Sequence, residues 1–432
     1  MTPQEASYTG PPSILEHDLN QYFPELLRFE STAEMEASEL WSRVGGEAER
    51  ILNAVVVSEP PASAGGTNEQ LSDAALINVS PPAHAGGSDI STVAWNLERG
   101  IRFDGILDAL RNHDDLKDKD LYLLTELDHG MARSGNRFVA QELANELGLN
   151  YAFAPVYIPL QKGSGVESDM EGENTTSIHG LGMLSRYPMS NVHAIPLPNG
   201  KDKMWGKEKR LGWLRAVIAD IEHPAGTFRA VTVHLDAHCS RAHRVLQMKI
   251  ILDHLDTLSP LPTLIGGDWN TTGFNSQSST RAILGYWRRV MMGPKNVALN
   301  HLPHPERFFE NRLFAQLESR GYRFRELNNI GVGTLHYDVG SIEKNTNLRD
   351  WVPEWCFPFI FWAAGRVGGI VHTRLDWFTA KGMEVAADST PRTIGNLVDA
   401  EGLPLSDHDA IGVELALSGL EQRGPRETRS GG

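Results

Sequence analysis

The sequence predicts a mixed α/β fold in which stacked β-sheets are covered by helices. From about residue 90 onward, short apolar runs typical of strands alternate with amphipathic runs typical of helices. Polar residues stand repeatedly at the carboxyl ends of the apolar runs, where open sheets commonly bind their ligands. With 41% hydrophobic and 22% charged residues, the chain has the composition of a folded globular protein.

The N-terminal part differs in pattern from the rest of the chain. Its apolar residues recur at helical spacing, as at Leu40, Val44, Ala48, Ile51 and Val55. Pro, Ala, Gly and Ser dominate residues 58–90, which we interpret as a linker or a surface loop. We therefore expect residues 1–90 to be a helical extension with its linker, residues 91–418 the main domain, and residues 419–432 a flexible tail.

Strands and helices alternate within the main domain. Strands are predicted at 91–96, 121–128, 152–159, 182–185, 214–221, 228–234, 263–267, 374–379 and 411–417. Helices are predicted at 103–112, 137–147 and 244–255, and the second of these is expected to stop at Gly148.

Charge and cysteine content narrow the class of protein. The formal net charge of −15 argues against nonspecific binding to long nucleic acid, although a local basic cleft is compatible with it. Cys239 and Cys356 can form at most one disulfide, which is consistent with a reducing compartment. No signal peptide is evident, and the apolar run 351–365 is shorter than the ~20 residues of a membrane-spanning helix. We expect a cytoplasmic protein without an integral membrane segment.

Polar side chains that could act in catalysis or metal binding follow the predicted strands. They are Asn96, Glu126, Asp128, His234, Asp236, His238, Asp268, Asn270, Asp376, Asp407 and His408. A single Asp at a strand end is usually a turn residue, but so many such positions indicate a site. Carboxylates and amides are hard oxygen ligands that suit Mg²⁺ or Mn²⁺, and His234 and His408 supply imidazoles. Together these groups are what attack of water on a phosphate ester requires.

The order of the motifs resembles the endonuclease/exonuclease/phosphatase superfamily, the metal-dependent phosphoesterases related to deoxyribonuclease I. The motifs are AWN, LLTELD, GLGMLSRYP, VTVHLDAH, GGDWN, RLDWF and SDHDAI, and they span residues 92–417. The resemblance implies a four-layered α/β sandwich of two packed mixed β-sheets flanked by helices. It also implies a hydrolase, of nuclease, phosphodiesterase or phosphatase type, that cleaves a phosphodiester or phosphomonoester.

The resemblance assigns roles to individual residues. Metal binding falls to Asn96, Glu126 and Asp407, with Mg²⁺ or Mn²⁺ as the cofactor. Asp268 matches the aspartate that aligns or deprotonates the attacking water. The phosphate contacts match His234 and Asn270, and Asp376 matches the aspartate that orients His408. Asp128, Arg133 and Arg186 are candidates for the rim of the site.

The implied substrate is a phosphate ester, either a small molecule, a lipid head group or nucleic acid. The acidic net charge favours small esters or head groups over long duplex DNA. The sequence does not identify protein partners.

The chain also departs from the family pattern. GDWN replaces the usual GDFN, and Ala410 stands where proline is usual. A long segment between Asn270 and Asp376, about 271–372, is interpreted as an insertion that flanks the cleft. It contains Trp287-Arg288-Arg289, interpreted as a solvated helix face, and the aromatic run 351–362, which fits core packing, a lipid-facing surface or a base-stacking platform.

Two other functions compete with the phosphoesterase. Strand alternation places His234, Asp236 and His238 on one face, where they could bind Zn²⁺ in a hydrolase. That hypothesis leaves Asn96 and Glu126 without roles. Alternatively, the fold could persist as a binding module with decayed chemistry.

Two further features are expected to be structural. Cys239 is interpreted as a small buried residue, and the acidic segment 164–173 as a mobile loop.

Overall fold

The structure is a computed structural model of the chain. It describes residues 9–10, 12–58, 89–271, 279–338 and 370–418, with a few isolated positions between 358 and 368. Most of the predicted linker, nearly all of the aromatic run 351–362, and the predicted tail lie outside the described residues.

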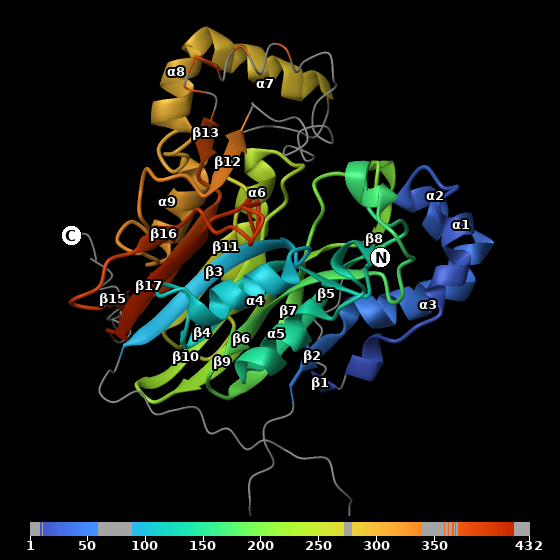
Figure 1. The fold of residues 1–432 in the computed structure, drawn as a ribbon, viewed down its shortest axis with the longest axis horizontal. Helices are drawn as coiled ribbons and strands as arrows, with labels where there is room; N and C mark the ends of the chain where they lie inside the picture. Colours follow the sequence, from blue (N-terminus) through green and yellow to red (C-terminus); the bar gives the residue numbers. More distant parts are fainter. Residues whose placement is uncertain are drawn as a thin grey trace, which may run out of the picture.

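The larger sheet joins the N-terminal segment to the main domain (Figure 1). Its strand order is β1 (Thr9–Gly10), β2 (Val55–Val57), β5 (Asn150–Pro159), β6 (Ile178–Ser185), β4 (Leu121–His129), β3 (Ile90–Arg99), β17 (Ala410–Leu417) and β15 (Met383–Val385). Two short strands extend it, β8 (Arg210–Gly212) on β5 and β16 (Arg392–Ile394) on β17. The neighbours β3 and β4 run parallel, whereas β17 is antiparallel to β3, so the sheet is mixed.

The smaller sheet carries half of the candidate site. Its order is β14 (Asp376–Lys381), β11 (Thr263–Asp268), β10 (Gly226–His234), β9 (Leu214–His223) and β7 (Met189–Leu197). Only β10 and β11 pair in parallel among these neighbours, so their carboxyl ends meet at one edge of the sheet.

The two sheets pack face to face and helices cover both outer faces, which confirms the predicted four-layered sandwich. Strand β4 shows why its sequence is apolar throughout. Leu121 and Leu123 point into the core between the sheets, whereas Tyr122 and Leu124 point into the core beneath the helices. The helices over the larger sheet are α3 (Glu39–Asn53), α4 (Phe103–Asn112) and α5 (Val139–Leu147), and those over the smaller sheet are α6 (Arg241–Leu255) and α9 (Asn311–Ser319).

Local sequence signals set where α5 ends and where α6 begins. Helix α5 stops at Gly148, which adopts a left-handed conformation with φ of 66° and donates its N–H to Ala144 and Asn145. Helix α6 begins earlier than predicted, because the Ser240 side chain accepts a hydrogen bond from the His243 N–H and caps the first turn.

The N-terminal segment contributes to the same core as the main domain. The prediction that Val55 continues a helix was wrong, because α3 ends at Asn53 and the β-branched run of β2 pairs with β5. Short helical pieces precede α3, namely η1 (Pro12–Leu15), η2 (Leu19–Tyr22), α1 (Phe23–Leu26) and α2 (Thr32–Glu36). Leu15 and Leu26 from these pieces are fully buried against the larger sheet. The division at residue 90 stays a prediction about the chain and does not mark a separate core.

Part of the predicted insertion stands above the sandwich (Figure 1). We call α7 (Ser279–Met292), α8 (Pro294–Asn296) and η6 (Val297–His301) the projection. Beneath it, β12 (Leu335–Asp338) and β13 (Ile370–Thr373) form a two-stranded antiparallel sheet. Among the described residues, no helix is both long and apolar enough to cross a membrane.

Candidate active site

Three predicted site residues stand in one row across the smaller sheet. The β-ladder pairs His234 with Asp268, and Asp268 with Asp376. Because these positions are neighbours on adjacent strands, the strand pairing itself brings their side chains together. The Nε2 atom of His234 lies 3.4 Å from Oδ2 of Asp268.

The larger sheet supplies Asn96 and Glu126 from the carboxyl ends of β3 and β4. Both strands are irregular there, since the β3–β4 register shifts after Asn96 and the β4–β6 register shifts between Leu124 and Leu127. Glu126 has a left-handed φ of 55°, unusual for a non-glycine residue and typical of functional positions. The Asn96 amide donates to Glu126 at 3.2 Å and to Asp268 at 3.2 Å, so it joins the two sheets.

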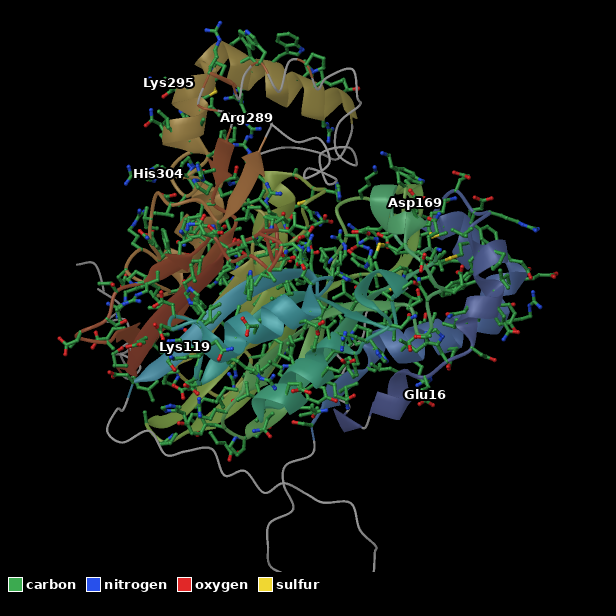
Figure 2. All side chains as sticks on the ribbon, in the orientation of Figure 1. Glu16, Lys119, Asp169, Arg289, Lys295 and His304 are labelled. Carbon is green, nitrogen blue, oxygen red and sulfur yellow. The ribbon has the colours of Figure 1, made fainter. Side chains whose placement is uncertain are left out.

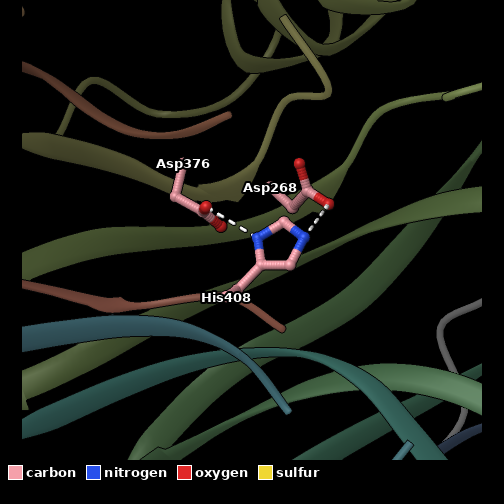
Figure 3. A group of neighbouring side chains, drawn as sticks. All are labelled: Asp268, Asp376 and His408. Atoms are coloured by element: carbon pink, nitrogen blue, oxygen red, sulfur yellow. Dashed lines mark hydrogen bonds and ion pairs between the residues drawn. The ribbon is translucent and has the colours of Figure 1, made fainter. Parts of the chain in front are cut away.

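His408 is held by a loop that is bonded to β3. The Ser406 hydroxyl donates to the Asn96 carbonyl, and the indole of Trp95 donates to the His408 carbonyl at 2.9 Å. Figure 3 shows the imidazole between two carboxylates. Its Nδ1 lies 2.8 Å from Asp376, and its Nε2 lies 3.9 Å from Asp268. These bonds hold the histidine in place although Ala410, where β17 starts, stands where proline is usual.

Asp268 is fixed by amide N–H groups. Its Oδ1 accepts from the backbone N–H of Asn270 at 2.8 Å, and its Oδ2 accepts from the Asn270 side chain at 3.1 Å. Asn270 has a left-handed φ of 50°, which bends the chain back onto Asp268. The intervening Trp269 is fully buried beside Trp377, so the aromatic residue of GDWN packs in the core.

These side chains open into one pocket of about 160 Å³. Of the predicted site residues, it is lined by Glu126, His234, Asp268, Asn270, Asp407 and His408. Asn96 and Asp376 contact the lining from behind. The structure therefore brings all eight predicted site residues together.

Electrostatics separate the roles of Asp268 and His408. Burial raises the pKa of Asp268 to about 6, although His234 and His408 oppose the shift. Burial alone would lower the pKa of His408, but Asp376 and Asp268 raise it well above its usual value. The imidazole is therefore protonated near neutral pH, and its Nε2–H can donate to an anion in the pocket.

Two groups of side chains offer donor atoms for a cation. In the first, ligand atoms of Asp268, Asp376 and His408 lie within 4.8 Å of one another. His408 is bonded to Asp376 through Nδ1 and approaches Asp268 through Nε2, so this group also fits proton handling.

The second group is Glu126, Asp407 and the neighbouring Glu98. The Asp407 backbone N–H donates to Glu98 at 3.1 Å, and burial with the nearby Asp407 charge raises the pKa of Glu98 to about 8. The pKa of Asp407 is also raised by burial, with Glu126 adding to the shift. Crowded carboxylates of this kind are the environment that a divalent cation stabilises.

A buried ion-pair network lies beside the pocket. The sequence indicated Glu126, Asp128 and Arg133 among its members but not Arg99, Glu167 and Glu208. Arg99 lies 3.7 Å from Glu126 and 3.3 Å from Glu167. Burial alone would raise the pKa of Glu126, but Arg99 and His234 lower it overall. Arg133 forms ion pairs with Asp128, Glu167 and Glu208. The acidic segment 164–173 is therefore tied to the site through η4 (Gly165–Asp169). Figure 2 labels Asp169, the last residue of η4. No motif signals this network, because its members come from four separate segments.

Two other sequence predictions need correction. Arg186 does not belong to the rim of the site, since it follows β6 and lies near Asp118 and Asp120, before the start of β4. The alternation behind the zinc hypothesis is also wrong, because β10 ends at His234. Asp236 instead accepts from the N–H groups of Gly200 and His238.

Cys239 is buried, as predicted. Burial raises the pKa of its thiol to about 12, so it is not a nucleophile near neutral pH.

Two packed mixed sheets with a polar pocket at their strand ends define a deoxyribonuclease I-like fold. A model of the Endonuclease/Exonuclease/phosphatase family matches residues 93–408, and the chain belongs to this family. Members of the family are generally hydrolases of phosphate esters and generally depend on divalent metals. The family and the fold that the sequence motifs indicated are thus confirmed.

Solved structures with similar folds share little sequence with the chain. One is an endonuclease/exonuclease/phosphatase from Beutenbergia cavernae, with 17% identity, a TM-score of 0.45, and coverage of 77% of this chain and 72% of that one. A Bacteroides vulgatus protein of the same description shows 14% identity, a TM-score of 0.42 and coverage of 76% and 99%. The human Nocturnin catalytic domain shows 16% identity, a TM-score of 0.40 and coverage of 76% and 93%. No curated protein matches the chain.

The buried ion pair between Asp128 and Arg133 is expected to stabilise the fold. Burial alone would raise the pKa of Asp128, but Arg133 and His179 lower it to about 2. We expect Asp128→Asn to lower the free energy of unfolding by about 3 kcal/mol at pH 7, because it leaves a buried arginine without its full counter-charge. A carboxyl group whose pKa is lower in the folded state stabilises the fold fully above about pH 4, and this stabilisation is lost as the pH falls toward 2. The difference in the free energy of unfolding between Asp128→Asn and wild type therefore shrinks over that window.

Urea unfolding at several pH values measures this difference. Asp104→Asn is the control, since that side chain is 90% exposed and its pair with Arg137 is worth little. Equal free energies of unfolding for Asp128→Asn and wild type at pH 7 would show that this ion pair does not stabilise the fold.

Proposed function

We propose that the chain is a metal-dependent phosphoesterase that hydrolyses a phosphodiester or phosphomonoester by attack of an activated water. The observation that supports this most is the convergence on Asp268. Its carboxylate lies within 3.4 Å of nitrogen atoms of Asn96, Asn270 and His234, which come from separate strand ends.

Asp268 is proposed to position and deprotonate the attacking water. Its amide donors fix the orientation of the carboxylate, and its pKa of about 6 lies close to neutral pH, where a general base is most effective. A carboxylate held in one rotamer loses little entropy when it binds water.

His408, His234 and Asn270 are proposed to contact the phosphoryl oxygens. His408 is the strongest of these donors, because Asp376 holds its Nδ1–H and leaves Nε2–H directed into the pocket. Donors fixed before the reaction stabilise charge that develops in the transition state. Asp376 acts through His408 and is therefore a positioning residue.

The residues of the pocket fit a divalent cation. Glu126 and Asp407 line it with carboxylate oxygens, and Asn96 adds an amide, a set that suits Mg²⁺ or Mn²⁺. We propose that Glu126, Asp407 and Asn96 hold the cation, and the Asn96 amide also bonds Glu126. A bound cation would neutralise phosphoryl oxygens and so favour attack at phosphorus.

Removal of divalent cations tests the proposal. We expect turnover of bis-p-nitrophenyl phosphate or p-nitrophenyl phosphate with Mg²⁺ or Mn²⁺ to fall at least about 100-fold in EDTA. Activity should return when the chelated protein is dialysed and supplied again with Mg²⁺ or Mn²⁺. Turnover that is unchanged by EDTA would overturn the proposed metal dependence, and return only with Zn²⁺ would point to a zinc hydrolase.

A substrate panel narrows the substrate. Single- and double-stranded DNA, RNA, sphingomyelin, inositol phosphates and nucleotides cover nucleic acids, lipid head groups and small esters. The net charge of −15 supports the small esters and head groups, because long duplex DNA is repelled by an acidic protein.

A further inference from the structure

Helix α7 in the projection exposes an apolar strip that the sandwich does not cover. Leu284, Trp287 and Met291 are 65%, 45% and 81% exposed, the values of surface residues. They are spaced three and four residues apart, so they lie along one face of the helix. Arg289 points the other way and is buried, with its guanidinium 4.7 Å from the Phe309 ring.

Basic residues flank this strip, in contrast to the rest of the chain. Arg281 and Arg288 are exposed on α7, and Lys295 is exposed on α8 (Figure 2). The sequence has no Asp or Glu from residue 269 to residue 305, although the whole chain carries a net charge of −15. The projection is therefore a local cationic surface on an acidic protein.

We propose that α7 docks the protein onto an anionic lipid surface. A helix with an apolar strip beside basic residues lies in the plane of a membrane interface, with its strip in the acyl boundary and its cations at the head groups. Leucine and methionine side chains neither stack on bases nor bond phosphate, so the strip fits lipid better than nucleic acid. The basic flanks of one copy would repel those of a second copy, so self-association fits less well.

The projection reaches the rim of the pocket through β13 and β12, because η6 packs against β13 and β13 pairs with β12. Leu335 at the start of β12 forms an isolated β-bridge with His408 and also lines the pocket. Docking through α7 would thus hold the pocket near the lipid surface. The proposal does not depend on the proposed chemistry, because binding to vesicles is measured without substrate.

Vesicle sedimentation tests the proposal with the full chain. We expect binding to vesicles of phosphatidylcholine with 30% phosphatidylglycerol, and at least about tenfold weaker partitioning to pure phosphatidylcholine or in high salt. The variants Leu284→Ala/Trp287→Ala/Met291→Ala and Arg281→Glu/Arg288→Glu should each lose at least about tenfold in partitioning.

Matched controls separate the strip from general surface effects. Trp205→Ala/Leu246→Ala/Val398→Ala removes apolar side chains of 62%, 45% and 51% exposure from other faces. Arg28→Glu/Arg43→Glu makes the same change in net charge at exposed positions in the turn after α1 and on α3. Both controls should bind vesicles like wild type, and all variants should keep the wild-type melting temperature and the same turnover of the soluble ester.

Three results would overturn the proposal. They are wild-type protein that does not sediment with anionic vesicles, α7 variants that bind as wild type does, and controls that lose as much as the α7 variants. A wild-type dimer in light scattering that the apolar α7 variant converts to a monomer, without vesicle binding, would assign the strip to a second copy instead.

Discussion

Asp268→Asn is expected to lower kcat by about 10³-fold, because loss of a general base costs about 10²–10⁴-fold. The substitution keeps the shape of the side chain but removes the proton acceptor that faces the pocket. It also places an amide among the N–H donors of Asn96 and Asn270, so a small loss of stability accompanies it. KM should change less than kcat, since the residue acts on the attacking water.

Steady-state kinetics on the soluble phosphate ester measure this effect, with circular dichroism as a check on folding. Asp220→Asn is a matched control, because Asp220 is buried on β9 and pairs with Arg229 at 2.7 Å, at a position that does not line the pocket. That variant should be less stable but fully active when folded. Asp268→Asn with wild-type kcat would rule out the assigned role.

Glu126→Gln is expected to lower kcat/KM by at least about 100-fold at limiting Mg²⁺. The change removes a negative charge that faces the pocket and takes one counter-charge away from Arg99, which lies 3.7 Å away. A cation would then bind more weakly, so excess Mn²⁺ should restore part of the activity. Rescue by metal distinguishes a ligand from a residue that merely supports the fold.

Glu222→Gln is the matched control for Glu126→Gln. Glu222 is exposed on β9, so the variant loses the same charge at a distance from the pocket. It should keep wild-type kinetics at every Mg²⁺ concentration. If Glu126→Gln had wild-type kcat/KM at limiting Mg²⁺, Glu126 would have no role in binding the cation.

The sequence was sufficient for those parts of the fold that depend on local pattern. The apolar run of β4 is buried on both faces, and the run of β11 likewise, so their strands could be predicted from continuous hydrophobicity. The candidate site was predictable for a related reason: His234 and Asp268 end apolar runs, and strand ends of a sheet meet at one edge. The motif order supplied the rest.

What the sequence did not predict depends on contacts between distant segments. Strand β7 went unnoticed because its burial is uneven and Pro196 interrupts its pattern. The pairing of Arg99 with Glu167 joins the end of β3 to η4, which follows β5, and no local spacing relates the two. The bulges that turn Glu126 toward the pocket are likewise set by register between strands and not by composition.

Direct binding of Mn²⁺, followed by electron paramagnetic resonance of the free ion, tests the central claim most closely. The claim is that separate strand ends form one pocket for a divalent cation and a phosphoryl group. The wild-type protein is predicted to bind Mn²⁺, Glu126→Gln to bind it at least about tenfold more weakly, and Glu222→Gln to bind it as wild type does. Wild-type protein that leaves Mn²⁺ free, or equal affinity in wild type and Glu126→Gln, would contradict the account.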